Sequence, residues 1–164
     1  MNGPTTIQES LKATQFLLNE YLKDFTDEEI LKRPVPGANH IAWQLGHLIG
    51  AEIHLIREQL PEASFPQLPD GFLDKHNKET AGIDDAGSFH SREEYVNLFN
   101  QVREATIALV GQLSEADLDR PTTGALAPFA PTLGAMLILV SNHTLMHGGQ
   151  FTVVRRQLGK PVLF

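Results

Sequence analysis

The sequence predicts an all-α protein, a four-helix bundle with one long crossover connection between the second and third helices. Four long segments carry apolar residues at helical spacing, and no segment shows the alternating pattern of a β-strand. The link over residues 61–90 is rich in proline and glycine. It exceeds the roughly 2–8 residues usual between bundle helices, so it can cross the bundle end and let the flanking helices run parallel. The 164 residues fit a single domain, 1–164.

The first two helices are expected over residues 6–25 and 39–60. In the first, Ile7, Leu11 and Leu18 recur on one face. In the second, a long apolar run is interrupted by histidines at intervals of seven residues. Both segments are therefore predicted to bury one face in the bundle.

The third helix is expected to begin at Ser91, because Ser91 and Glu94 have the spacing of a capping box. Its apolar face extends to Leu113. The fourth helix is expected over residues 132–158. It ends before Gly159 and a following proline, which is a typical helix terminus.

Two short helices are expected in the links. Thr26 and Glu29 form a second capping box, and the segment they open ends before Pro34. Ser114 and Asp117 have the same arrangement in the link between the third and fourth helices. Each short helix precedes one of the long helices.

The net charge of −7 argues against binding to nucleic acid or to an anionic membrane surface. Residues 121–154 contain no charged residue, but prolines and polar side chains interrupt them, so they predict a buried helix and no membrane span. The absence of cysteine excludes disulfides, thiolate metal sites and a cysteine nucleophile. The N-terminus lacks the pattern of a secretory signal, so a cytoplasmic location is expected.

His143 and His147 are the strongest candidates for a metal-binding site in the sequence. They are four apart in the fourth helix, so both rings project from one face about 5–6 Å apart at Cβ. The surrounding residues are apolar, and an unpartnered imidazole is costly to bury there. One shared metal ion would satisfy both rings, although hydrogen-bonded core histidines would also fit the pattern.

A third ligand is expected from the second helix, where His40, His47 and His54 lie near one stripe. His47 is in the middle of the helix among apolar residues, and this position favours it mildly over the other two. The segment from His143 to His147 lacks the glutamate of the zincin motif, and no Glu-x-x-His pair of a di-iron bundle occurs. The two histidines of the long link, at 76 and 90, are expected to be exposed.

These features resemble the DinB/YfiT-like superfamily. The resemblance rests on residues 43–48 with a helix-two histidine, on residues 142–150 with His-x-x-x-His followed by Gly-Gly-Gln, and on the tail 155–161. It covers nearly the whole chain in the order of its elements. Members are four-helix bundles with a long crossover, and the name is unrelated to the DNA polymerase that shares it.

The resemblance implies that His47, His143 and His147 bind one divalent metal ion, such as nickel or zinc, and that the protein is a homodimer. Activities in the superfamily include thiol-dependent S-transferases. The expected function is therefore a metal-dependent transferase that joins a small-molecule thiol to an electrophile, with no catalytic side chain assigned. Gln150 is a candidate for binding the ligand or a metal-bound water. The alternative is a non-catalytic metal- or ligand-binding bundle.

Overall fold

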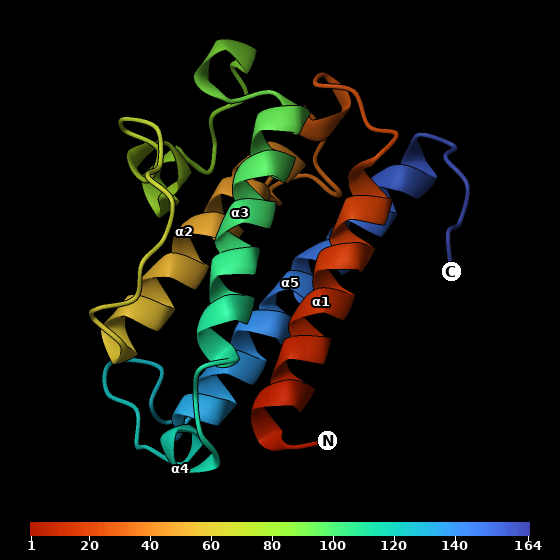
Figure 1. Cartoon of the computed structure of the whole chain (residues 1–164). Coiled ribbons are helices and arrows are strands. Elements are labelled where there is room, and N and C mark those ends of the chain that lie inside the picture. Colours follow the sequence, from red (N-terminus) through yellow and green to blue (C-terminus); the bar gives the residue numbers. More distant parts are fainter.

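A computed structural model describes all 164 residues and confirms the all-α fold. The four long helices are α1 (Gly3–Leu22), α2 (Ile41–Gln59), α3 (Arg92–Val110) and α5 (Leu133–Gln157) (Figure 1). A short helix, α4 (Glu115–Leu118), lies between α3 and α5. No β-strand forms, and the isolated bridge between Pro121 and Thr132 only closes the loop before α5. No helix is both long enough and apolar enough to cross a membrane.

The polar caps explain where the helices begin. The side chains of Ser91 and Ser114 form reciprocal capping boxes at the starts of α3 and α4, as predicted. Helix α1 begins and ends three residues earlier than the expected range of 6–25. Its start lies earlier because the Asn2 side chain accepts the backbone N–H of Thr5, and a proline fits the first turn.

The crossover makes α2 and α3 run in the same direction, whereas α1 and α5 both run the opposite way (Figure 1). Hydrogen bonds join α1 to its two neighbouring helices. The Gln8 side chain of α1 donates to the Ile107 carbonyl of α3, and the Ser10 hydroxyl of α1 bonds that of Ser141 in α5. Helix α2 also packs between α3 and α5. The bundle is thus a ring of four helices in which α2 and α5 are antiparallel neighbours.

The crossover is ordered and closely packed. It contains the 3₁₀ helices η2 (Asp74–His76), η3 (Lys78–Thr80) and η4 (Ala86–Ser88). The expectation that His76 is exposed was wrong: it is 5% exposed, its Nδ1–H donates to the Phe72 carbonyl at 2.6 Å, and its Nε2 accepts from Tyr95 of α3 at 2.7 Å. Gly46 of α2 makes room for it, because a Cβ there would lie 2.1 Å from the His76 ring.

The core has two apolar clusters separated by a polar layer. One cluster surrounds the crossover end of the bundle, and the other lies toward the N-terminus of α5. Between them lies Arg103 of α3, which is fully buried and contacts the other three long helices. Its guanidinium pairs with Glu52 of α2 at 2.8 Å and donates to Thr14 of α1 and Thr144 of α5, each at 2.8 Å. Helices α2 and α5 are therefore fixed relative to each other just beyond the predicted metal ligands.

Candidate metal centre

The structure brings His47 of α2 together with His143 and His147 of α5. One ring nitrogen from each histidine lies within 4.8 Å of the other two, and all three residues are half-buried. The four-residue spacing in α5 places two rings on the face toward α2, as expected. The antiparallel packing of α2 against α5 brings the third ring from a residue almost a hundred positions earlier.

The distances between the rings suit one shared ion. The Nε2 atoms of His143 and His147 are 3.1 Å apart, and the ring centroids of His47 lie 5.1 and 5.4 Å from those of His143 and His147. A divalent ion such as zinc binds imidazole nitrogen at about 2.0–2.1 Å. Two nitrogens at the observed separation can both reach a single ion, and the third ring is close enough to complete a three-histidine set.

Gln44 orients one ligand, and the sequence analysis missed it. Its side-chain amide nitrogen donates to the Asn39 carbonyl at 2.6 Å, which turns its oxygen toward Nδ1 of His147, also at 2.6 Å. An amide oxygen can only accept, so Nδ1 of His147 carries the proton and Nε2 presents its lone pair to the site. The available signal was an isolated polar residue in the apolar run Ala42–Leu45, one turn before His47.

Trp43 supports the second ligand. Its ring stacks on His47 with centroids 5.2 Å apart and planes inclined by 9°. The indole N–H donates to the Asn77 carbonyl of the crossover at 3.1 Å, and the side chain is 5% exposed. Trp43 is thus a core residue, and it also restricts the ring of His47.

Burial keeps the three rings neutral at physiological pH. It lowers the pKa of His143 to about 4 and that of His147 to about 3, with smaller contributions from the other rings of the cluster. Burial also lowers the pKa of His47. Because a neutral imidazole is the form that coordinates metal, the cluster is in its ligand form near pH 7.

The other candidate residues have different positions. His40 caps α2: its Nδ1 accepts the Trp43 N–H at 3.1 Å, and its Nε2–H donates to the Ile83 carbonyl at 3.0 Å. It is fully buried. His54 is exposed two turns beyond His47, and Gln150 is half-buried one turn beyond His147 with no hydrogen bond from its side chain. A ligand-binding role for Gln150 stays a prediction.

No carboxylate serves as a base beside the three rings. Glu52 is 3% exposed and is held by Arg103 and by the Thr106 hydroxyl, which donates to it at 2.6 Å. Glu58 is exposed at the far end of α2, next to Gly124. Neither carboxylate of α2 is therefore placed to accept a proton at the three rings.

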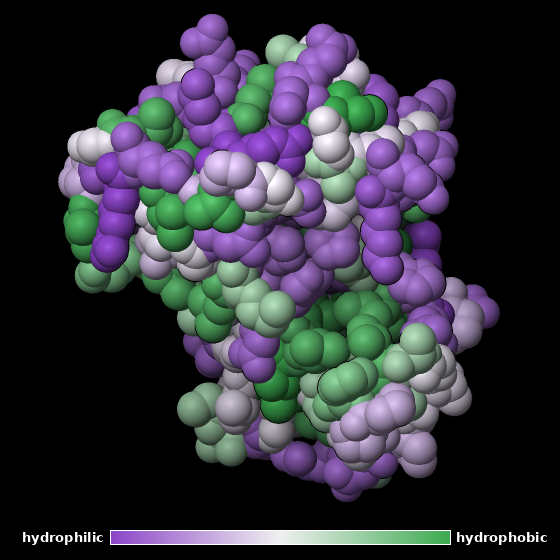
Figure 2. Space-filling model, turned by 180° about the vertical axis from the view of Figure 1, so that it is seen from behind, coloured by the Kyte–Doolittle hydropathy of each residue, from purple (hydrophilic) through white to green (hydrophobic).

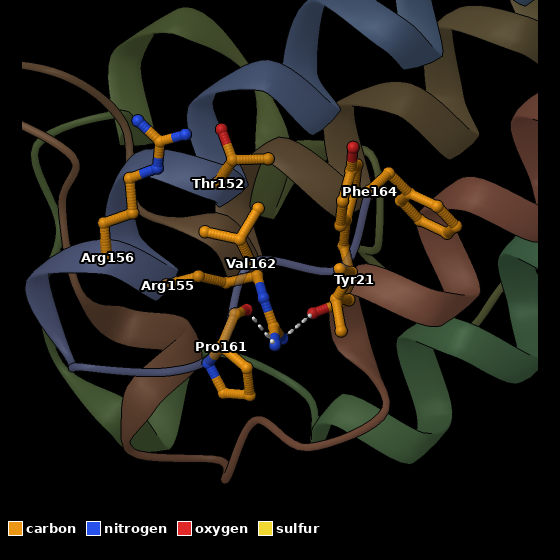
Figure 3. Close-up of a pocket in the computed structure, with 8 residues that line it drawn as sticks. Tyr21, Thr152, Arg155, Arg156, Pro161, Val162 and Phe164 are labelled. Atoms are coloured by element: carbon orange, nitrogen blue, oxygen red, sulfur yellow. Dashed lines mark hydrogen bonds between the residues drawn. The ribbon is translucent and has the colours of Figure 1, made fainter.

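A separate cavity of about 170 Å³ lies at the C-terminal end of α5 and contains none of the three histidines (Figure 3). Arg155 lines it: the guanidinium donates to the carbonyls of Tyr21 at 2.8 Å and Pro161 at 3.2 Å, and it pairs with Asp24. The side chain is only 2% exposed. Its hydrogen bonds fasten the C-terminal tail to α1, so the cavity is a product of tail packing.

Comparisons with known proteins agree with this arrangement. A family model of the DinB superfamily matches residues 10–151. YfiT from Bacillus subtilis, described as a probable metal-dependent hydrolase with an unusual four-helix bundle topology, has a TM-score of 0.71 at 15% identity, over 96% of this chain and 89% of that one. A DinB-like protein from Bacillus cereus has a TM-score of 0.68 at 19% identity, over 96% and 95%.

A conserved protein from Enterococcus faecalis has a TM-score of 0.66 at 18% identity, over 98% of this chain and 99% of that one. At these identities the likeness to the three solved structures concerns the fold. The search of curated proteins finds no match.

Proposed function

Since this chain belongs to the DinB superfamily, we propose that it is a divalent-metal-dependent transferase of the thiol S-transferase type. The observation that carries the proposal is the cluster of His47, His143 and His147, with ligand atoms within 4.8 Å of one another. A structural zinc site normally has four protein ligands, whereas a catalytic site has three and keeps a position open. Three histidines without a cysteine or carboxylate beside them match the catalytic kind.

The residues present fit a metal ion such as nickel or zinc. The three rings are neutral, and one of them is held by Gln44 with Nε2 free to ligate. Such an ion lowers the pKa of a coordinated thiol or water and so supplies a nucleophile near neutral pH. The protein's own residues set the geometry: Gln44 and Trp43 fix two of the rings, and Arg103 holds α2 and α5 at a constant separation.

In the proposed reaction the sulfur of a low-molecular-weight thiol attacks an electrophilic carbon of the second substrate. A carbon–sulfur bond forms, the bond from that carbon to its leaving group breaks, and the leaving group departs with the electron pair. The thiol proton passes to solvent. No side chain is needed as a base, which agrees with the engagement of Glu52 by Arg103.

Hydrolysis is the second candidate, favoured by the likeness in fold to YfiT, which is described as a probable metal-dependent hydrolase. In that reaction a metal ion held by the three histidines would activate water in place of a thiol. The two candidates differ in their nucleophile, and the following test distinguishes them.

The test compares protein loaded with zinc or nickel with protein stripped by a chelator. Each is given a thiol such as cysteine or glutathione together with a fluorogenic alkylating agent such as monochlorobimane, and separately an activated ester. Thioether formation that needs both the metal and His143 supports the transferase. Ester hydrolysis alone supports the hydrolase, and tight metal binding without either reaction supports a non-catalytic binding protein.

A further inference from the structure

The three histidines lie at one end of an apolar strip that continues along both of their helices. On α5, Leu139 and Ala135 precede His143 by four and eight residues, so they lie on the same face one and two turns away. On α2, Ala51 follows His47 by one turn. All three are half-buried, which means that part of each side chain meets solvent beside the rings.

The face of the molecule on which the strip lies is hollowed. Helices α2 and α5 lie at the back of the molecule in Figure 1, and the view from behind in Figure 2 shows hydrophobic side chains gathered in a depression on this face. Beneath it, Leu55 of α2 and Met136 of α5 belong to the buried core cluster at this end of the bundle. Leu139 and Ala135 pack against the same cluster from the outside.

The lining carries no charge over its length. Helix α5 has no charged residue before Arg155. On the corresponding stripe of α2, the exposed imidazole of His54 follows Ala51, and the first carboxylate after His47 is Glu58, which lies against Gly124 at the far end. Beyond His54, a charged or strongly polar substrate body would lose its hydration in the depression without gaining a partner.

We propose that this depression binds the body of the substrate, and that the substrate is a molecule with an aliphatic chain whose reactive end lies at the histidines. The inference rests on the proposed function, because it takes the open metal position as the place of the reactive end. The strip from His143 to Ala135 spans eight residues of helix, about 12 Å, which accommodates an extended medium-length chain. Ala51 and Leu139, each one turn from a histidine, are the residues of the strip nearest to the rings in their helices.

The experiment measures binding of straight-chain hydroxamates to the zinc-loaded protein by calorimetry, in the order acetohydroxamate, butyrohydroxamate, hexanohydroxamate and octanohydroxamate. The hydroxamate head coordinates the metal, and only the chain changes. Each buried methylene should tighten binding about threefold to fourfold. Ala51→Phe should abolish this gain, because its ring fills the depression. Because Ala51 is one turn from His47, the gain is measured relative to acetohydroxamate binding by the same variant.

Two further variants keep the result interpretable. Leu139→Ser should also reduce the gain, and it replaces Ala51→Phe as the test if that variant does not fold. Ala13→Phe, at an exposed position of α1, is the control and should leave the gain unchanged. Binding of acetohydroxamate with no gain along the series would overturn the inference and leave the proposed function standing. A gain that survives both depression variants would also overturn it. Failure of acetohydroxamate to bind the loaded protein would overturn the proposed function, and the inference with it.

Discussion

The side-chain oxygen of Gln44 lies 2.6 Å from Nδ1 of His147 and thereby decides which nitrogen of that ring faces the metal centre. The two residues come from different helices, α2 and α5. The contact is unambiguous because the Gln44 amide nitrogen is already engaged by the Asn39 carbonyl. A buried glutamine thus accepts the hydrogen bond that a carboxylate often accepts from the non-ligating nitrogen of a metal-binding histidine.

Replacing Gln44 should weaken metal binding without removing a ligand. Gln44→Leu is expected to lower the affinity for zinc about 10-fold to 100-fold, the usual effect of losing such an outer hydrogen bond. Gln44→Glu should keep part of the affinity: one carboxyl oxygen can accept from Nδ1, but an ionised carboxylate cannot donate to the Asn39 carbonyl as the amide nitrogen does. Competition with a chromophoric chelator measures both. Gln59→Leu, which removes bonds to Thr123 at the other end of α2, is the control. Equal affinity in Gln44→Leu and the parent would show that His147 does not depend on this contact.

The metal stoichiometry should separate His47 from His54, two histidines of the same helix. His47→Ala, like His143→Ala and His147→Ala, is expected to lose the ion that the parent retains. His54→Ala is expected to keep it, because His54 lies outside the cluster. Elemental analysis by mass spectrometry, on protein purified without a nickel column, gives the ratio of metal to chain. Retention of the ion by His47→Ala would mean that the site does not include α2.

The helices could be predicted from the sequence because their signals are local. The Ser91–Glu94 and Ser114–Asp117 capping boxes lie within one turn, and the structure contains both. The pair His143 and His147 could be found for the same reason. The choice of His47 over His40 came from the resemblance to a family more than from spacing. The structure gives the physical difference: His40 caps α2 with one nitrogen and bonds the crossover with the other.

Contacts between distant segments could not be predicted in this way. The bond from His147 to Gln44 depends on the register of two antiparallel helices, and no local pattern reports that register. The burial of His76 depends on how the crossover folds back onto Gly46 and Tyr95. The homodimer expected from the resemblance stays a prediction, as does the identity of the metal.

Removing one partner of the Arg103–Glu52 ion pair should strongly destabilise the fold, whereas replacing both partners with apolar residues should have a much smaller effect. Arg103→Met leaves the Glu52 carboxylate buried without a partner and should cost about 3–5 kcal/mol of unfolding free energy. The double variant Arg103→Met/Glu52→Leu should recover most of this loss. The Thr14 hydroxyl would keep its bond to the Leu11 carbonyl at 3.1 Å. The Thr106 hydroxyl, released from Glu52, can donate to the Val102 carbonyl, which is also 3.1 Å away.

Urea denaturation of the metal-free protein measures the three stabilities. The exposed pair of Lys12 and Glu9 provides the contrast, because its removal should cost less than about 1 kcal/mol. A double variant as unstable as Arg103→Met alone would show that the network, and not the unpaired charge, provides the stability.

The stability of the metal-free protein should fall as the pH is lowered from about 6.5 to about 4, and His76 should account for part of the fall. Burial lowers the pKa of His76 from 6.5 to about 4, so in this window the unfolded chain binds a proton that the folded chain does not. The contribution of the neutral His76 ring to the free energy of unfolding is complete above pH 6.5. It declines as the pH falls and stops changing below about pH 4. A shift of this size corresponds to roughly 3 kcal/mol.

The measurement is the free energy of unfolding in urea at pH 7, 6, 5 and 4.5, for the parent and for His76→Gln. The variant is expected to be less stable at pH 7, because it disturbs the bonds to Tyr95 and Phe72, and to lose less stability on acidification. The pKa values of His143 and His147 are lowered in the same direction, so the variant should keep part of the pH dependence. If the two proteins lose stability in parallel, His76 takes up its proton in the folded state, and the crossover is not held by a neutral ring.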